Sequence, residues 1–157
     1  MTVIHSEADI DAPREGVWSI LTDFSRYPEW NPFTVSVRST LAMGAPVELR
    51  VRMMGGLFGR WPGGWYQSQT EFVRVFEPGR KVAWGDDRMM GGLVTAVRTQ
   101  WLEDLPGGRT RYVNEDAIGG PLEGLVIRFF GSSMQVGFDR VAEALKTRAE
   151  AMHAAAR

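Results

Sequence analysis

The segment from residue 13 to residue 33 constrains the fold of this chain more than any other stretch. Pro13 suits the first turn of a helix, where its missing N–H leaves no hydrogen bond unmade. Apolar side chains then recur at helical spacing, at Val17, Ile20, Leu21 and Phe24. Pro28 and Pro32 prevent continuation, so residues 25–30 form at most a second, short helix. A strand precedes this segment and mostly strands follow it, which predicts a sheet wrapped around an interior and closed at one end by short helices.

Most of the remaining chain has the pattern of strands. Residues 3–10 and 47–53 alternate apolar and polar side chains, as half-buried strands do. Further strands are expected at residues 34–40, 66–77, 81–85, 93–105 and 109–118. Short turns containing Pro78-Gly79 and Pro106-Gly107-Gly108 separate several of them, which favours antiparallel pairing.

The hydrophobic period changes near the C-terminus. Apolar residues recur every three or four positions, at Met134, Phe138, Val141, Leu145, Ala149 and Met152. This spacing predicts a long amphipathic helix. Residues 122–130 would form its first section, with a kink or break near Gly131. We therefore expect one α+β domain over residues 1–157, a curved antiparallel sheet of about seven strands around this helix.

Composition excludes several classes of function. The net charge of −1 provides no basic surface for nucleic acid. The chain has no cysteine, which excludes disulfides, thiol nucleophiles and thiolate metal sites. His5 and His153 are the only histidines and lie in no metal-binding or catalytic motif, so no metal or other cofactor is expected. Neither a signal peptide nor a membrane-spanning run is evident, so we expect a cytoplasmic protein without stable membrane insertion.

A set of short motifs links the chain to a known family. They are Ile10-Asp11-Ala12-Pro13, Val17-Trp18, Leu21-Thr22-Asp23, Tyr27-Pro28-Glu29-Trp30-Asn31-Pro32, Glu77-Pro78-Gly79, Val82-Ala83-Trp84, Gly108-Arg109-Thr110-Arg111 and Ala144-Leu145-Lys146. In this order the chain resembles, over nearly its whole length, the START-like or Bet v 1-like (SRPBCC) superfamily of the polyketide cyclase/dehydrase and lipid-transport type. Members carry lipids, bind hormones, cyclise polyketides or assist chaperones. The resemblance implies a helix-grip fold with a cavity between the sheet and the C-terminal helix.

The resemblance also implies which residues would bind a ligand in that cavity. They are Trp84, Tyr112, Asn114, Ile118, Met134, Phe138, Val141, Leu145, Met54 and Trp30. The expected partner is a hydrophobic or aromatic small molecule, because ligand pockets are mostly apolar with a few polar groups. The alternative is that these side chains fill a solid core.

Polar residues on inward positions are the candidates for chemistry. Alternation in residues 110–118 places Tyr112, Asn114, Asp116 and Ile118 on one face, and its apolar members indicate that it faces inward. Relatives often have His and Glu at the positions of Asn114 and Asp116, so a histidine-based mechanism is not supported. An inward Asp116 among apolar walls would have a raised pKa and act as a base. The alternative is that it accepts backbone hydrogen bonds at the strand end.

Arg74 is a further catalytic candidate. The pattern does not fix which way it faces, nor does it for Gln69, Arg98 and Gln100. An inward arginine would pair with a carboxylate or an anionic ligand, whereas an outward one would be solvated.

One hexapeptide occurs twice: Arg52-Met53-Met54-Gly55-Gly56-Leu57 and Arg88-Met89-Met90-Gly91-Gly92-Leu93. Either two glycine turns are similar by chance, or two flexible Met-rich turns flank the mouth of the cavity. The apolar, glycine-rich segment 53–65 has three interpretations: a lid, a contact between two copies in a homodimer, or a hairpin tip packed on the body.

Three functions are consistent with these features. The first is a binding module for a lipid- or polyketide-like molecule, with residues 54–65 and 87–92 as gates. The second is a cyclase or dehydratase in which Asp116, Asn114, Tyr112 or Arg74 acts on such a ligand. The third is a protein-interaction module that uses an exposed tip at residues 61–66. The chain has many apolar residues and no catalytic motif, which favours the binding module.

Overall fold

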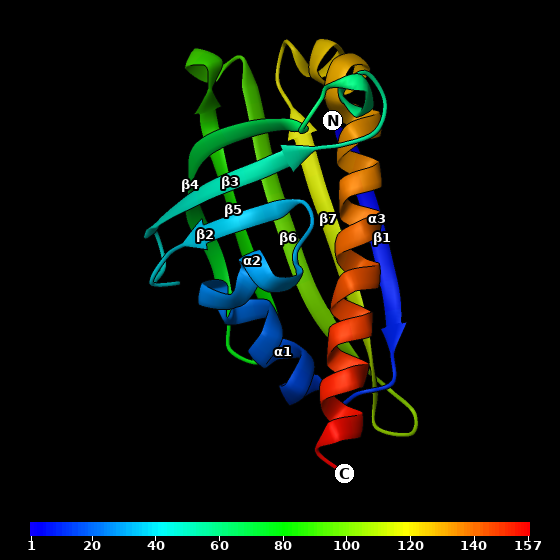
Figure 1. Cartoon of the computed structure of the whole chain (residues 1–157). Coiled ribbons are helices and arrows are strands. Elements are labelled where there is room, and N and C mark those ends of the chain that lie inside the picture. Colours follow the sequence, from blue (N-terminus) through cyan, green and yellow to red (C-terminus); the bar gives the residue numbers. More distant parts are fainter.

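A seven-stranded antiparallel sheet forms the body of the protein in a computed structural model that describes residues 1–157 (Figure 1). The strands are β1 (Thr2–Ile10), β2 (Thr34–Arg38), β3 (Pro46–Met53), β4 (Trp65–Glu77), β5 (Lys81–Met89), β6 (Val94–Leu105) and β7 (Arg109–Gly119). Their order in the sheet is β1-β7-β6-β5-β4-β3-β2, so the first and last strands of the chain are neighbours. The predicted α+β architecture is confirmed.

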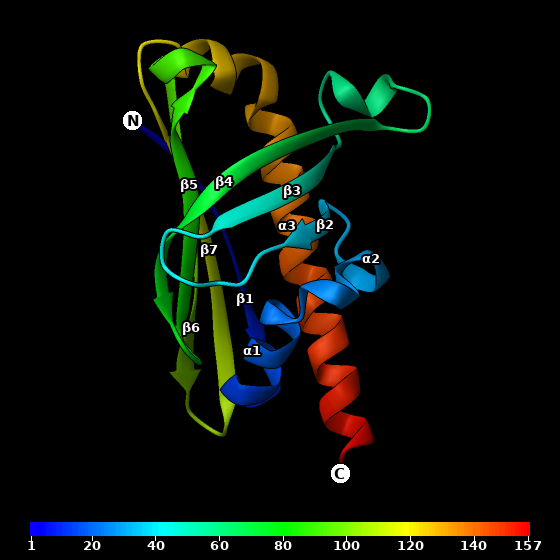
Figure 2. The ribbon, with the colours of Figure 1, turned by 90° about the vertical axis from the view of Figure 1, so that its left-hand side faces the viewer.

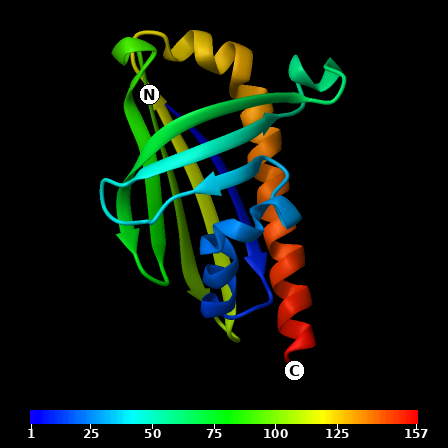
Figure 3. The same ribbon diagram turned by 60° about the vertical axis from the view of Figure 1, so that its left-hand side comes forward.

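Helices close one end of the sheet and cover its concave face. Helix α1 (Arg14–Thr22), the single turn η1 (Phe24–Arg26) and helix α2 (Tyr27–Trp30) connect β1 to β2, and helix α3 (Glu123–Ala155) follows β7. Strands β2, β3 and β4 slope across β5, β6 and β7, so that the sheet curls toward α3 (Figures 2 and 3). No helix combines the length and the apolar character that crossing a membrane requires.

The strand with the clearest alternation of apolar and polar residues, β3, buries its apolar face as predicted. Every second residue of β3, from Val47 to Met53, is buried, while the residues between them are exposed. The prediction for the fifth strand was too short, because β5 continues past Gly85 to Met89. Asp86 and Met89 pair with Ala96 and Val94 of β6, and the register shifts between them at the polar residues Asp87 and Arg88. Alternation does not signal such a shift.

Helix α3 is continuous from Glu123 to Ala155, so the alternative of a break near Gly131 is wrong. Its axis bends between its first turns and the remainder, as Figures 2 and 3 show in the change from gold to orange. Further along, Gly137 lets the helix approach the sheet closely, since a Cβ there would lie 2.2 Å from the ring of Phe33. The ring of Phe33, the residue before β2, therefore packs directly on the backbone of the helix.

The two ends of the interior are packed differently. Beside α1, fully buried Leu145 and Tyr112 belong to a dense cluster with Val17 and Leu21. Burial of one such leucine contributes roughly 1.5–3 kcal/mol. Toward the N-terminal end of α3, buried and half-buried methionines and aromatic rings surround an unfilled space. The fold thus places its dense core at the α1 end and a cavity at the other end.

Candidate ligand cavity

A cavity of about 230 Å³ lies between the sheet and the first half of α3. Of its 20 lining residues, 14 are hydrophobic. The apolar lining includes Phe33, Met53, Met89, Met90, Val94, Val126, Phe130, Met134 and Phe138. Met90 is also 64% exposed, so the cavity reaches the protein surface beside this residue.

The polar lining is concentrated on the sheet. Gln67, Gln69 and Glu71 alternate along β4 and therefore face inward together. Arg98 of β6 and Asp116 of β7 are direct partners in the strand register, so they share the same face of the sheet. The cavity consequently has one apolar wall, largely from α3 and the turns, and one polar wall from the middle of the sheet.

Arg98 is held by neighbouring side chains. Its Nε donates to Oδ1 of Asn114 at 2.7 Å, and its Nη1 donates to Oγ1 of Thr34 at 3.0 Å. Its guanidinium carbon lies 4.6 Å from the centre of the Phe138 ring, a cation–π contact. The Nη2 atom is buried and has no hydrogen-bond partner. Arg98 is therefore a positioned cation with one donor group unused.

Asp116 lies opposite Arg98, but its buried Oδ1 accepts no hydrogen bond from that residue or from any other group. Only 7% of the residue is exposed. Burial raises the pKa of this carboxyl to about 6, and the positive charge of Arg98 partly offsets the rise. A buried carboxylate without a donor is costly to the fold, so the position is unfavourable unless something else pairs with it.

Glu71 is the second buried carboxyl of the polar wall. The side-chain amide of Gln69 donates to it. Burial raises the pKa of Glu71 to about 7, the charge of Asp116 adds to the rise, and the Gln69 hydrogen bond and Arg98 act against it. Because the two carboxyls interact, they titrate as a pair. With pKa values of about 6 and about 7, this pair retains a proton for part of the time at neutral pH.

Several predicted site residues are brought together here. Those that line the cavity are Trp84, Asp116, Ile118, Met134 and Phe138. Asn114 is fully buried behind Arg98 and orients it. The facing of three undecided residues is now clear: Gln69 and Arg98 line the cavity, and buried Gln100 accepts a 2.7 Å hydrogen bond from the hydroxyl of Tyr112.

Other predicted residues lie outside the cavity. Tyr112 and Leu145 belong to the dense core beside α1, and Trp30 packs between the core clusters. Val141 is buried in the neighbouring cluster, and the sulfur of Met54 lies 3.3 Å from Nη1 of Arg140. Arg74 is 38% exposed at its side chain and forms an ion pair of 2.8 Å with Asp87 on the outer face. As a catalytic candidate, Arg74 is therefore separated from the cavity by the sheet.

Glu71 is the important residue that the sequence analysis missed. Strand β4 has polar residues at its inward positions, so it shows no apolar face to follow. Val73 gave one signal, because it is a buried apolar residue of β4 and Glu71 lies two positions before it on the same face of the strand. Extending the face of Val73 backwards would have placed Glu71 inside.

The two copies of the repeated hexapeptide lie at the same end of the molecule (Figures 1 and 3). Met53 from the first copy and Met89 and Met90 from the second line the cavity. The Phe58 ring, in the turn after the first copy, stacks on Phe130 of α3 with centroids 5.2 Å apart. Trp61, at the tip of this segment, is 57% exposed. The segment thus contacts the cavity wall at one point and exposes an apolar tip at another.

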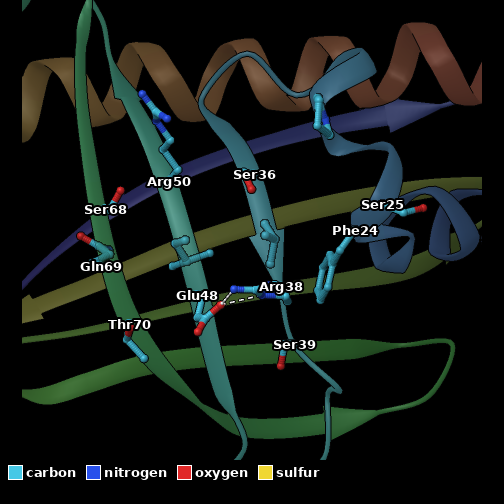
Figure 4. A pocket seen from close by; sticks show the side chains of 13 residues that line it. Phe24, Ser25, Ser36, Arg38, Ser39, Glu48, Arg50, Ser68, Gln69 and Thr70 are labelled. Atoms are coloured by element: carbon cyan, nitrogen blue, oxygen red, sulfur yellow. Dashed lines mark hydrogen bonds and ion pairs between the residues drawn. The ribbon is translucent and has the colours of Figure 1, made fainter.

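A larger depression lies on the outside of the sheet, over β2, β3 and β4 (Figure 4). Its volume is about 1050 Å³, but only 3 of its 13 lining residues are hydrophobic. Arg38 and Glu48 form an ion pair of 2.6 Å across it, and both side chains are largely exposed. Such a solvated, polar groove does not remove an apolar ligand from water, so the internal cavity is the better candidate site.

Comparison with known proteins agrees with this architecture. Residues 1–150 match the family described as polyketide cyclase / dehydrase and lipid transport, and the chain belongs to this family. That description suggests hydrophobic ligands. No curated protein matches the chain.

Solved structures with the same fold include the Zhui aromatase/cyclase from Streptomyces sp. R1128, at 16% identity and a TM-score of 0.70, covering 95% of this chain and 93% of that one. The protein TTHA0849 from Thermus thermophilus is 16% identical with a TM-score of 0.69, covering 96% and 99%. The AHSA1-like protein from Aeromonas hydrophila is 18% identical with a TM-score of 0.66, covering 96% and 94%. At these identities the similarity establishes the fold alone.

Proposed function

We propose that this protein binds a hydrophobic small molecule of lipid- or polyketide-like chemistry in the cavity between the sheet and α3. The observation that carries the proposal is a mainly apolar internal space with a small set of convergent polar groups. Family membership supports it, because the family includes lipid carriers and polyketide cyclases.

The volume limits the size of the ligand. A cavity of roughly 150 Å³ holds a benzene molecule, whereas drug-sized ligands occupy roughly 300–1,000 Å³. At about 230 Å³ the cavity suits one ring with a short chain. A larger ligand requires movement of the two Met-rich turns, residues 54–65 and 87–92, which we propose as the gates.

Binding of butylbenzene as a neutral apolar probe, measured by isothermal titration calorimetry, tests this function. Val126 lines the cavity, whereas Leu125 beside it on α3 is exposed. Val126→Phe should weaken binding at least about tenfold, because the added ring takes up cavity space that the probe would occupy. Leu125→Phe, the matched control, leaves binding unchanged. Equal binding by both variants and the wild type would place the probe elsewhere and contradict the proposal.

A second candidate function is a dehydratase- or cyclase-type reaction. The specific observation that favours it is the buried, unpaired Asp116 carboxylate beside Glu71. In the dehydration of a β-hydroxyketone, Asp116 would take the proton from the carbon next to the carbonyl. A protonated Glu71 would give its proton to the departing hydroxyl, which leaves as water.

The release of benzylideneacetone from 4-hydroxy-4-phenylbutan-2-one, followed by ultraviolet absorbance, measures this reaction. Asp116→Asn reduces the rate at least about a hundredfold if the carboxylate is the base. Glu115→Gln, an exposed change on the same strand, leaves the rate unchanged. A rate that does not depend on Asp116 contradicts the enzymatic alternative and leaves the binding function standing.

A further inference from the structure

Arg98 and Asp116 face each other on neighbouring strands and do not form an ion pair. Arg98 instead donates hydrogen bonds to Asn114 and Thr34 and contacts the Phe138 ring. Each residue keeps a buried polar atom without a partner, Nη2 of Arg98 and Oδ1 of Asp116. Both residues line the cavity, so its polar wall contains one donor and one acceptor that lack a partner within the protein.

The charges around this pair are unfavourable for an ionic ligand. A carboxylate group would pair with Arg98, but it would lie beside Asp116 and Glu71, which repel it. A protonated amine would pair with the carboxylates, but it would lie beside Arg98, which repels it. Like charges brought together in a buried site cost several kcal/mol, so either ion gives up most of what its pairing gains.

A hydroxyl group suits both unused atoms. Its oxygen accepts from the guanidinium and its hydrogen is donated to the carboxylate, so one neutral group satisfies two buried charged residues. Hydrogen bonds to charged groups are the stronger ones, and leaving a buried charged atom unpaired is costly. A methyl group at the same point offers neither bond and leaves both charged atoms without a partner.

The surroundings of Asp116 reinforce this selection. Glu71 of β4 and Arg98 of β6 are the charged groups that share its wall, and Asp86 of β5 influences Glu71 from nearby. Thr34 comes from β2, and the lining residues from α3 are all apolar and carry no titratable group. Apart from Arg98, which does not pair with Asp116, no neighbouring element supplies a positive charge that would take the place of a polar ligand group.

We infer that the polar wall of the cavity selects a neutral hydroxyl group, so that the ligand is an alcohol or phenol on an apolar body of about one ring and a short chain. This inference rests on the proposed binding function and adds the chemical class of the head group. Asp116 and Arg98 are its specificity-determining residues.

Four compounds with the same phenylpropyl body test the inference: 3-phenylpropan-1-ol, 3-phenylpropylamine, 4-phenylbutanoate and butylbenzene. The binding of each compound to the wild-type protein at pH 7 is measured by isothermal titration calorimetry. We expect the alcohol to bind at least about tenfold more tightly than each of the other three, as a net hydrogen bond to a charged group predicts.

The variant Asp116→Ala separates specificity from folding. It removes the acceptor without breaking any hydrogen bond at the buried Oδ1. The advantage of the alcohol over butylbenzene falls to about threefold or less, while butylbenzene binding persists and shows that the cavity is intact. Glu115→Ala, on the outer face of the same strand, keeps the full advantage of the alcohol.

Two results would overturn the inference while leaving the binding function in place. One is tighter binding of the amine, the carboxylate or butylbenzene than of the alcohol. The other is an unchanged preference for the alcohol in Asp116→Ala. If none of the four compounds binds, the proposed function itself fails, and the two failures are thereby distinguished.

Discussion

Replacing Asp116 by Asn should stabilise the protein, and the gain should depend on pH. The folded-state pKa of Asp116, about 6, lies above its ordinary value of 3.8. Below pH 3.8 the carboxyl is protonated in both the folded and the unfolded states, and burial carries no charge penalty. Between pH 3.8 and about 6 the carboxyl is ionised in the unfolded state but still largely protonated in the folded state, so the free energy of unfolding falls as the pH rises through this range. Above about pH 6 the buried group is ionised as well, and the loss is complete.

The size of the effect follows from the shift. The difference between 3.8 and about 6 corresponds to roughly 3 kcal/mol at alkaline pH. Asn keeps the shape of the protonated side chain and remains neutral at every pH. The difference in unfolding free energy between Asp116→Asn and the wild type should therefore grow by roughly 3 kcal/mol between pH 4 and pH 8.

Urea unfolding followed by tryptophan fluorescence at several pH values measures this difference. Glu115→Gln, exposed on the same strand, serves as the control and should change the unfolding free energy by less than about 0.5 kcal/mol. If the Asp116→Asn curve parallels that of the wild type from pH 4 to pH 8, the carboxylate is solvated or paired and the reasoning about the polar wall is refuted.

Three other substitutions test the packing and the charges around the cavity. Glu71→Gln should also stabilise increasingly as the pH rises from 4.5 through about 7, as measured by the same urea titrations, and a pH-independent effect would contradict its burial as an acid. Arg98→Met should destabilise by roughly 2–4 kcal/mol, because it breaks two buried hydrogen bonds, and a melting temperature equal to that of the wild type would show that these bonds contribute nothing. Gly137→Ala should destabilise by roughly 1–3 kcal/mol, since the new Cβ meets the Phe33 ring. Gly124→Ala, with open space around its Cβ on the same helix, should instead stabilise by up to about 1 kcal/mol, and an equal effect of both glycine substitutions would contradict the close approach.

The fold was predictable because its signals are periodic. Alternation in β3 and the three-to-four residue spacing in α3 follow directly from which faces are buried. The family resemblance rested on motifs spread along the chain, and the match over residues 1–150 confirms it. The end of β5 was missed because a register shift, and not a hydrophobic pattern, extends it.

The polar wall was only partly predictable, for a physical reason. Inward positions are recognised by apolar side chains, but on the polar wall of the cavity the inward residues are polar. Asp116 was placed on the inner face by its apolar neighbours at alternate positions, whereas the facing of Arg98 stayed open. Val97 and Trp101 make the other face of β6 equally apolar, so alternation does not distinguish the two faces. Tertiary pairing with Asn114 decides the orientation of Arg98.

Methyl NMR of the methionines tests most directly whether the space between the sheet and α3 holds a small molecule. Met53, Met89 and Met134 line the cavity, whereas Met43 and Met152 are exposed and lie outside its lining. Titration with 3-phenylpropan-1-ol should shift the signals of the first three and give contacts between their methyl groups and the phenyl ring, with Met43 and Met152 unchanged. Shifts confined to the exposed methionines, or no shift in the cavity methionines at saturating alcohol, would contradict the account.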